Sequence, residues 1–270
     1  MSITKVIGFI GGGNMAEAIV RGLLARKLVS PAQVLVSDPS ANRRAFFETL
    51  GIEATSDNCD VVRRAQTVVL AVKPQYMDEA LAACAQGLRP EQMVISIAAG
   101  IRTEKISSLC GGRASVIRVM PNTPALVGRG VSALCRGPRA SQSQLQLAVN
   151  LFSAIGRTLV VEEKDMDAIT AISGSGPAYI FYWMESMLKA ATQAGFDAKT
   201  ARDLVYGTFE GAVQLAEQSS ETPDVLRARV TSKGGTTEAA IRTMNERGMD
   251  AAVAAAIEAA TTRSRELSGT

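Results

Sequence analysis

Short apolar runs recur along the first 163 residues and alternate with segments of helical periodicity. The runs Thr67–Val72 and Met93–Ala98 are apolar along nearly their whole length, which indicates strands covered on both faces. This alternation predicts a doubly wound α/β domain of the Rossmann type. The strands are expected at 5–10, 34–37, 67–72, 93–98, 115–119, 131–135 and 157–161.

The pattern changes at Lys164. Beyond it strand-like runs vanish, and helical segments are separated by turn residues. The chain is therefore expected to consist of a dinucleotide-binding domain over residues 1–163 and an all-helical domain over residues 164–270. The punctuating positions are 174–177, Gly195, Pro223, 234–235 and Gly248.

One helical segment in the second half, residues 179–194, is apolar around nearly its whole circumference. Such a helix is normally buried on all sides. The short helical domain offers little chain to cover it, so we expect an interface between subunits and hence a homodimer. The alternative is a central helix buried within one subunit. The apolar positions are Tyr179, Ile180, Phe181, Tyr182, Trp183, Met184, Met187 and Leu188.

The composition fits a globular protein with real hydrophobic cores, since 47% of the 270 residues are hydrophobic. The net charge of +3 comes from 29 basic and 26 acidic residues that are scattered, which argues against nucleic acid as a partner. No apolar stretch is long enough to span a bilayer. Because the first strand begins within a few residues of the start, no room is left for a targeting segment, and a cytoplasmic location is expected.

The four cysteines lie far apart, without any Cys-x-x-Cys pair, and the chain contains no histidine. We interpret the cysteines as small buried apolar residues, and no metal site is expected. The absence of histidine also excludes every mechanism that uses imidazole as an acid or base. The cysteines are Cys59, Cys84, Cys110 and Cys135.

The first strand runs into three consecutive glycines and a helix start. Gly11 and Gly13 let the backbone turn sharply and approach a diphosphate, while the first N–H groups of the helix face the anion. Ala16 lets that helix pack close to the strand. The helical period over residues 14–27 and the strand at Val34–Val36 complete a βαβ unit, so the segment predicts dinucleotide binding.

The segment after the second strand bears on the choice of cofactor. An acidic side chain here would bind a ribose hydroxyl, whereas hydroxyl and arginine groups would accept a 2′-phosphate. Both signals are present, but Ser37, Arg43 and Arg44 favour NADPH, with NADH as the alternative. The competing interpretation of the two arginines is a solvated helix face.

Three further strand ends carry small residues or proline. They are Ala71-Val72-Lys73-Pro74, the run 96–100 with Ala98, and the run 118–124 with Pro121 and Asn122. Ligands of such sheets bind at the carboxyl ends of the strands. Together these ends predict a cleft around the nicotinamide end of the cofactor.

A second candidate anion site lies at residues 230–238, where a loop with two glycines and two threonines opens a helix. The backbone N–H groups of such a helix start can hold a carboxylate, assisted by the hydroxyls of Ser232 and Thr236. The alternative is ordinary N-capping by serine or threonine, with Glu238 in the first turn. The residues alone leave both interpretations open.

Five motifs in this order and spacing closely resemble the pyrroline-5-carboxylate reductase family, from end to end of the chain. The resemblance implies reduction of (S)-1-pyrroline-5-carboxylate to L-proline by NADPH or NADH, the last step of proline biosynthesis. It also implies a homodimer through the helical domain, with larger rings such as a decamer of dimers in many members. The motifs are Phe9–Ala16, Ala71–Pro74, Met120–Pro124, Ser173–Tyr179 and Thr231–Thr237.

The resemblance also implies roles for individual residues. Gly11, Gly13, Asn14 and Met15 would cradle the diphosphate, and Asn58 and residues 71–74 would line the cofactor groove.

The substrate carboxylate would be held by Ser232, Gly234, Gly235, Thr236 and Thr237, with the Thr237 hydroxyl on the ring nitrogen as the catalytic group. The chain departs from the family at Lys233, where many relatives have proline. This lysine either stiffens the loop less or adds a positive charge near the carboxylate.

The implied chemistry suits a chain without histidine, because a cyclic imine that arrives protonated needs little acid catalysis from the protein. The protein then has to press the imine carbon against the nicotinamide and exclude water. A threonine hydroxyl can orient the nitrogen, although it is a weak acid unless water relays the proton.

Three rival functions are weighed against this one. The β-hydroxyacid dehydrogenases resemble one another in placing a lysine on the long helix after a glycine-rich turn, but here no lysine follows Gly174–Gly176 until Lys189. Reduction of other cyclic imines stays open as an alternative, because the shape of the pocket decides which ring size is accepted. A nucleotide-sensing protein without turnover has no need of the loop at Ser232–Thr237.

Overall fold

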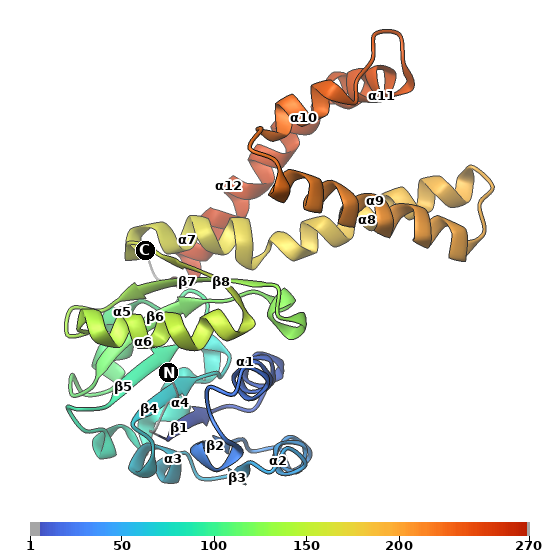
Figure 1. Ribbon diagram of the computed structural model, residues 1–270. Helices are drawn as coiled ribbons and strands as arrows, with labels where there is room; N and C mark the ends of the chain where they lie inside the picture. The colour runs from blue at the N-terminus through green and yellow to red at the C-terminus, as the bar shows by residue number, and fades with distance from the viewer. Residues whose placement is uncertain (1–5, 269–270) are drawn as a thin grey trace. The chain divides into compact units, whose positions relative to one another are not determined.

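The computed structural model describes residues 6–268 (Figure 1). It divides into two compact units, of which the first comprises the chain up to Ser175 and again from Ala259, and the second comprises Gly176–Glu258. The division expected from the sequence lies at 163/164 instead. The difference arises because residues 164–175 and the end of the last helix pack with the first unit.

The first unit is built on one eight-stranded sheet in the order β3-β2-β1-β4-β5-β6-β7-β8. All neighbouring strands are parallel except β6 and β7, which are antiparallel. This order is that of a Rossmann-type domain with two added strands, as the sequence predicts. The strands are β1 Ile7–Ile10, β2 Val34–Ser37, β3 Glu53–Thr55, β4 Thr67–Leu70, β5 Met93–Ser96, β6 Ser115–Met120, β7 Gly130–Arg136 and β8 Gly156–Val160.

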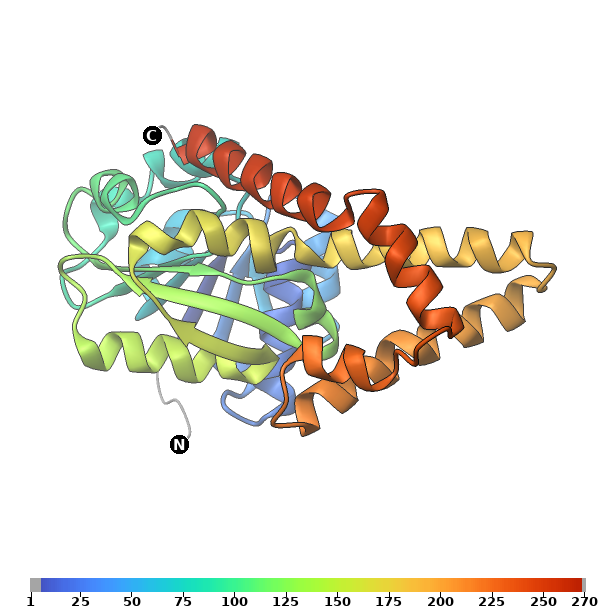
Figure 2. The same ribbon diagram turned by 90° about the horizontal axis from the view of Figure 1, so that it is seen from above.

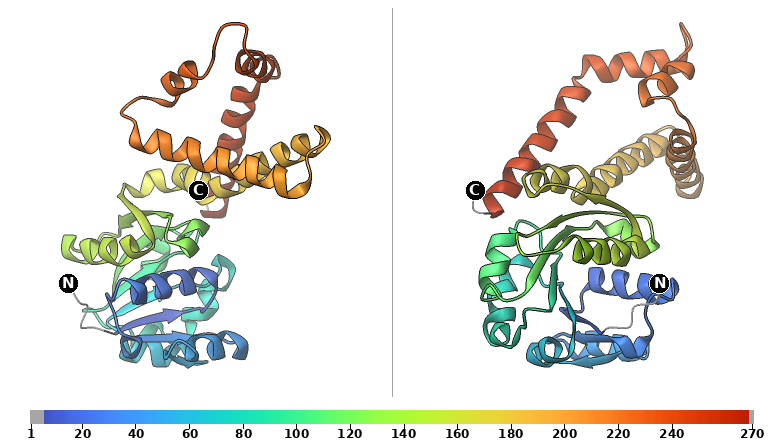
Figure 3. Two further views of the ribbon diagram at one scale, coloured as in Figure 1. Left: turned by 45° about the vertical axis from the view of Figure 1, so that its right-hand side comes forward. Right: turned by 60° about the vertical axis from the view of Figure 1, so that its left-hand side comes forward.

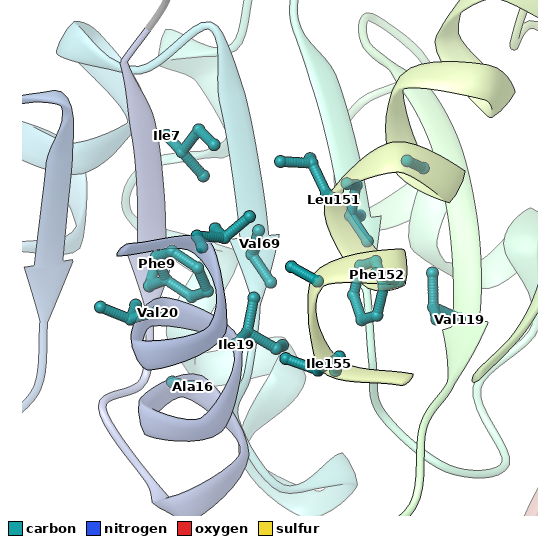
Figure 4. Close-up of a cluster of buried hydrophobic side chains, with 14 of the residues drawn as sticks. Ile7, Phe9, Ala16, Ile19, Val20, Val69, Val119, Leu151, Phe152 and Ile155 are labelled. Carbon is teal, nitrogen blue, oxygen red and sulfur yellow. The ribbon is translucent and has the colours of Figure 1, made fainter. Parts of the chain in front are cut away.

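Helices cover both faces of this sheet. Alternate residues of a strand enter different cores: Val69 of β4 packs with one cluster, whereas Val68 and Leu70 pack with the other. Figure 4 shows the first cluster, which includes Phe9 of β1 and Ile19 of α1. The first cluster includes α1 Asn14–Ala25, α2 Ala41–Glu48 and α6 Gln142–Phe152, and the second includes α3 Asn58–Arg64, α4 Met77–Ala82 and α5 Thr103–Leu109.

Seven of the eight strands fall where the hydrophobic pattern predicts them, and Lys5, the first residue of the first expected strand, lies outside the described residues. The sequence reading missed β3. This strand has three residues, Glu53–Thr55, lies at the sheet edge, and is exposed or half-buried, so it carries no apolar run.

The second unit is entirely helical, as expected, and its first two helices, α8 and α9, form a hairpin (Figure 3). The helix α12 begins in the second unit and ends in the first (Figure 2). Within residues 6–268, no helix combines the length and apolarity needed to cross a membrane. The helices are α8 Gly176–Gln193, α9 Ala198–Gln218, α10 Pro223–Arg229, α11 Thr236–Glu246 and α12 Met249–Ser268.

The end of α12 is fastened to the first unit by a buried hydrogen bond. The hydroxyl of Ser264 donates to Asp167 Oδ1 over 2.7 Å, and both side chains are buried. Asp167 belongs to α7 (Met166–Ile169). Leu267 lies against Gly100, which follows β5. These contacts make the last ten residues of α12 part of the first unit.

Candidate functional site

The strand order reverses at β1, which lies between β2 and β4, and the loops after these strands form the first candidate site. Gly11 follows β1 with a φ of +97°, and its amide donates to the Ser37 carbonyl over 2.8 Å. A Cβ at this position would lie 2.8 Å from the Ala71 carbonyl oxygen. Conformation and space therefore both require glycine here.

Gly13 leaves the start of α1 open. It is the N-cap residue with a φ of −71°, and no side chain caps the helix, so the first N–H groups have no partner from that side. A Cβ on Gly13 would meet nothing within 4 Å. Asn14 is exposed and Met15 half-buried beside it. An uncapped helix start with free space in front fits a diphosphate.

Gly12 connects the segment Gly11–Met15, here called the cradle, to the end of β2. Its amide donates to Asp38 Oδ2 over 2.8 Å, and its carbonyl accepts from Arg43 Nε over 2.6 Å. The Arg43 guanidinium also pairs with Glu17 on α1 at 3.0 Å. The Asp38 carboxylate thus braces the glycine loop, a role that the sequence reading missed because an aspartate after β2 is typical of ribose binding.

The guanidinium groups of Arg43 and Arg21 keep the Glu17 carboxylate ionised. Burial would raise its pKa, but hydrogen bonds and charge from Arg43 and Arg21 together outweigh burial and hold the pKa below its ordinary value. The two partners lie 3.0 Å and 2.9 Å from the carboxylate. The cradle therefore keeps a fixed carboxylate–guanidinium pair at its rim.

Arg44 is also engaged with backbone near the cradle. Its Nη1 donates to the carbonyls of Asp38 and Pro39, each over 2.8 Å. Both Arg43 and Arg44 are half-buried, and Ser40 caps their helix α2 by accepting from the Arg43 amide. They are thus held at the end of β2 and do not form the solvated helix face of the competing interpretation.

Ser37 and Asn58 are bonded to each other. The buried Ser37 hydroxyl donates to Asn58 Oδ1 over 2.7 Å, and Asn58 Nδ2 donates to the Ala80 carbonyl over 3.0 Å. Both side chains therefore fix the ends of β2 and α3 to α4. A direct contact of either with the cofactor stays a prediction from the sequence.

The remaining strand ends lie along the carboxyl edge of the parallel strands. After β4, Ala71 and Val72 are half-buried, while Lys73 and Pro74 are exposed. Ala98, after β5, is buried in the second core cluster. Of these, the segment 71–74 is the part offered to a ligand at this edge.

Asn122, at the end of β6, has a bracing role. Its Nδ2 donates to the Ser173 carbonyl over 3.0 Å, and its Oδ1 accepts from the Val131 amide over 2.8 Å. Pro121 beside it is buried. These contacts connect the end of β6 to β7 and to the π-helical turn Thr170–Gly174, and a direct contact of Pro121 or Asn122 with the cofactor stays a prediction from the sequence.

The second candidate site lies in the second unit, between α10 and α11. Gly235 is the N-cap of α11 and no side chain caps it, which contradicts the alternative of N-capping by serine or threonine. The Gly234 amide donates to Glu238 Oε2 over 2.7 Å, and the Gly235 amide donates to the Ser232 carbonyl over 3.0 Å. The Gly234 N–H therefore already has a hydrogen-bond partner, whereas the first N–H groups of α11 have no side-chain partner.

Three hydroxyls remain available in this loop. In the part of the chain that the structure describes, those of Ser232, Thr236 and Thr237 enter no hydrogen bond, and the first N–H groups of α11 have no side-chain cap. Ser232 and Thr236 are exposed, and Thr237 is half-buried. Such a loop can accept a carboxylate through hydroxyl and backbone donors.

The four cysteines have no assigned role in either candidate site. Cys84, Cys110 and Cys135 are buried and Cys59 half-buried, all as free thiols. Burial raises the pKa of Cys84 to about 11 and that of Cys110 and Cys135 to about 12. No group of three or more cysteine and acidic side chains among residues 6–268 is placed to hold a metal ion.

Comparison with known families finds one match in each half of the chain. Residues 163–267 match the family described as pyrroline-5-carboxylate reductase dimerisation, and residues 6–100 match NADP oxidoreductase, coenzyme F420-dependent. The pyrroline-5-carboxylate reductase of Haemophilus influenzae is 42% identical, with 97% of each chain covered. The chain belongs to the pyrroline-5-carboxylate reductase family. The enzyme of Pseudomonas aeruginosa is 44% identical, covering 98% of this chain and 97% of its own.

Solved structures of this family superpose over the whole chain. A pyrroline-5-carboxylate reductase from Coxiella burnetii gives a TM-score of 0.91 at 38% identity, with 99% of this chain and 100% of that chain covered. The Plasmodium falciparum enzyme, solved with NADP bound, gives 0.91 at 28% identity with the same coverage. A 3-hydroxyisobutyrate dehydrogenase from Mycobacterium tuberculosis shares only the fold, at a TM-score of 0.53 and 14% identity over 76% of this chain and 71% of that one.

Proposed function

We propose that the turn after β1 and the loop before α11 each bind one of the two reactants in the reaction of this family. That reaction is the NAD(P)H-dependent reduction of (S)-1-pyrroline-5-carboxylate to L-proline, the last step of proline biosynthesis. The cradle at Gly11–Met15 holds the cofactor diphosphate, and the loop Ser232–Thr237 holds the carboxylate of the imino acid. The open, uncapped start of α1 in front of Gly13 is the observation that carries the cofactor half.

The cofactor is NADPH, and NADH is the alternative. The two guanidinium groups of Arg43 and Arg44 are held beside the end of β2, where a 2′-phosphate would lie. The Asp38 carboxylate, which would favour a free ribose hydroxyl, is occupied by the amides of Gly12 and Ser40. Both observations support the phosphorylated cofactor. When bound, NADPH supplies the hydride.

The loop positions the substrate. Its free hydroxyls and helix N–H groups bind the carboxylate, and Thr237 directs its hydroxyl to the ring nitrogen. A substrate that arrives as the iminium needs no strong acid, which is consistent with a chain that contains no histidine. Thr237 therefore orients the reacting group and does not serve as the main proton source.

The match to a dimerisation family indicates that the chain associates with itself. A homodimer formed through α8, and a decamer of such dimers, follow as proposals. The exposed fractions of Phe181 and Tyr182 on α8, 62% and 69%, support a partner surface there. A cytoplasmic location stays a prediction from the sequence.

Oxidation of NADPH followed at 340 nm tests the function and the catalytic residue together. We expect turnover with pyrroline-5-carboxylate and much less with its six-membered homologue. Thr237→Val should lower kcat by about tenfold, the cost of one hydrogen bond in the transition state, while leaving the KM for NADPH near that of the wild type.

Equal turnover of the two ring sizes would redefine the substrate as cyclic imino acids in general. No oxidation with either would contradict the proposed reaction. If the wild type reduces pyrroline-5-carboxylate and Thr237→Val has the same kcat, Thr237 has no part in the mechanism. The assignment of the substrate would not be affected by that result.

A further inference from the structure

A single acidic side chain closes the loop that precedes α11. Glu238, in the first turn of the helix, reaches back to the Gly234 amide, which donates to Glu238 Oε2 over 2.7 Å. This is a charge-assisted hydrogen bond between a carboxylate and a backbone N–H group. It spans the two glycines that separate the loop from the helix.

Little else restrains these glycines. Gly234 has a φ of +74°, a conformation that glycine adopts freely and leaves just as freely. The amide of Lys233 before it donates no hydrogen bond within residues 6–268. The Gly235 amide forms a local turn with the Ser232 carbonyl, where a Cβ on Gly235 would lie 2.5 Å from Ser232 Oγ. The Glu238 contact is therefore the side-chain restraint on Gly234.

We propose that Glu238 is a positioning residue for substrate binding: by holding the Gly234 amide it fixes the loop in the conformation that receives the imino-acid carboxylate. The inference rests on the proposed role of the loop Ser232–Thr237 in binding the substrate. A loop that is ordered before binding loses less conformational entropy when the ligand arrives.

The restraint needs an oxygen acceptor at position 238, and an amide oxygen supplies one without the negative charge. A carboxylate beside the substrate carboxylate repels it, and this repulsion opposes binding. An uncharged acceptor of the same shape keeps the restraint without the repulsion. Glutamine at this position therefore separates the two effects, whereas alanine removes both.

The test uses steady-state NADPH oxidation by the full-length protein at varied pyrroline-5-carboxylate. Glu238→Ala should raise the KM for the imino acid about five- to tenfold, with the KM for NADPH unchanged. Glu238→Gln should keep the KM for the imino acid at or below that of the wild type. Lys233→Pro stiffens the loop by another route, so adding it to Glu238→Ala should bring this KM back to within about twofold of the wild type.

Amide hydrogen exchange of residues 231–237 in the ligand-free protein gives a readout independent of activity. Exchange should be faster in Glu238→Ala and slower again in the double variant. Glu246→Ala, at the other end of α11 and paired only loosely with Arg242 at 4.0 Å, is the matched control and should change neither readout.

The outcomes separate this inference from the proposed site. If Thr237→Val impairs turnover but Glu238→Ala leaves the KM for the imino acid unchanged, the positioning role is wrong and the site stands. If neither variant affects catalysis, the loop does not bind the substrate and both proposals fail. If Glu238→Gln is as impaired as Glu238→Ala and Lys233→Pro restores nothing, Glu238 acts through its charge, which overturns the restraint.

Discussion

At the scale of single residues, glycines that look alike in the sequence differ in what surrounds them. Gly13 faces open space at the start of α1, whereas a Cβ on Gly22 of the same helix would lie 2.5 Å from Ile155. The first position leaves room for a ligand. The second lets α1 pack against the short helix Ser153–Ile155.

This contrast makes a prediction for Gly13→Ser. Serine is a favourable N-cap residue, so the melting temperature should not fall. The new side chain fills the space in front of the helix and takes one of its N–H groups, so the KM for NADPH should rise at least about tenfold. Thermal melting and steady-state kinetics measure both quantities.

Gly22→Ala is the matched control for Gly13→Ser. It should lower the melting temperature because its methyl group meets Ile155 and the Ala154 carbonyl oxygen, and any protein that stays folded should keep its affinity for NADPH. A normal KM for NADPH in Gly13→Ser would show that the diphosphate does not approach this helix start.

Sequence reading at this scale proposed residues for the site but not what each one touches. Asn122 and Ser37 were expected at the cofactor, yet their side chains are bonded to other parts of the first unit. Asp38 and Glu238 brace the two glycine loops, a role that was not expected of either. The acidic group after β2 was one of two opposing signals for the cofactor, and Glu238 belonged to the N-cap alternative that the residues left open. Hydrogen-bond partners distant in sequence depend on tertiary structure, which no local motif encodes.

At the scale of elements, α2 presents the cofactor's candidate phosphate ligands. Replacing Arg43 and Arg44 together by alanine should raise the KM for NADPH by about a hundredfold, the loss of charge-assisted bonds to a phosphate. The KM for NADH should rise less, by several-fold, because Arg43 also holds the Gly12 carbonyl that both cofactors need.

Kinetics with each cofactor measure this difference. Arg63→Ala is the control, since this arginine of α3 pairs with Asp57 and Asp60 at the surface. Equal losses for the two cofactors would reject the assignment of Arg43 and Arg44 to the 2′-phosphate and leave them a purely structural role.

Elements with a strong hydrophobic pattern could be predicted, and weak ones could not. The strands β4 and β5, buried on both faces, are continuous apolar runs, and their neighbours follow at regular spacing. The edge strand β3 has no such run, because its side chains need no core to cover them. The strand β7 was foreseen, but its antiparallel direction was not part of the pattern.

At the scale of the whole molecule, the exposed apolar side chains of α8 predict self-association. Light scattering on the purified protein should give at least a dimer. Phe181→Glu, which places a charge on this exposed surface, should shift the protein to smaller species while leaving the helical content unchanged. A clean monomer of the wild type at micromolar concentration would contradict the interface.

The hydrogen bond between Ser264 and Asp167 has a consequence for the order in which the protein is made. During translation the first 175 residues emerge early, but the segment that completes their unit is synthesised only after the whole second unit. Until then Asp167 lacks its hydroxyl partner and Gly100 lacks its cover by Leu267. The nascent nucleotide-binding unit therefore lacks these two contacts until the ribosome has synthesised the end of α12, about 90 residues after the rest of the unit.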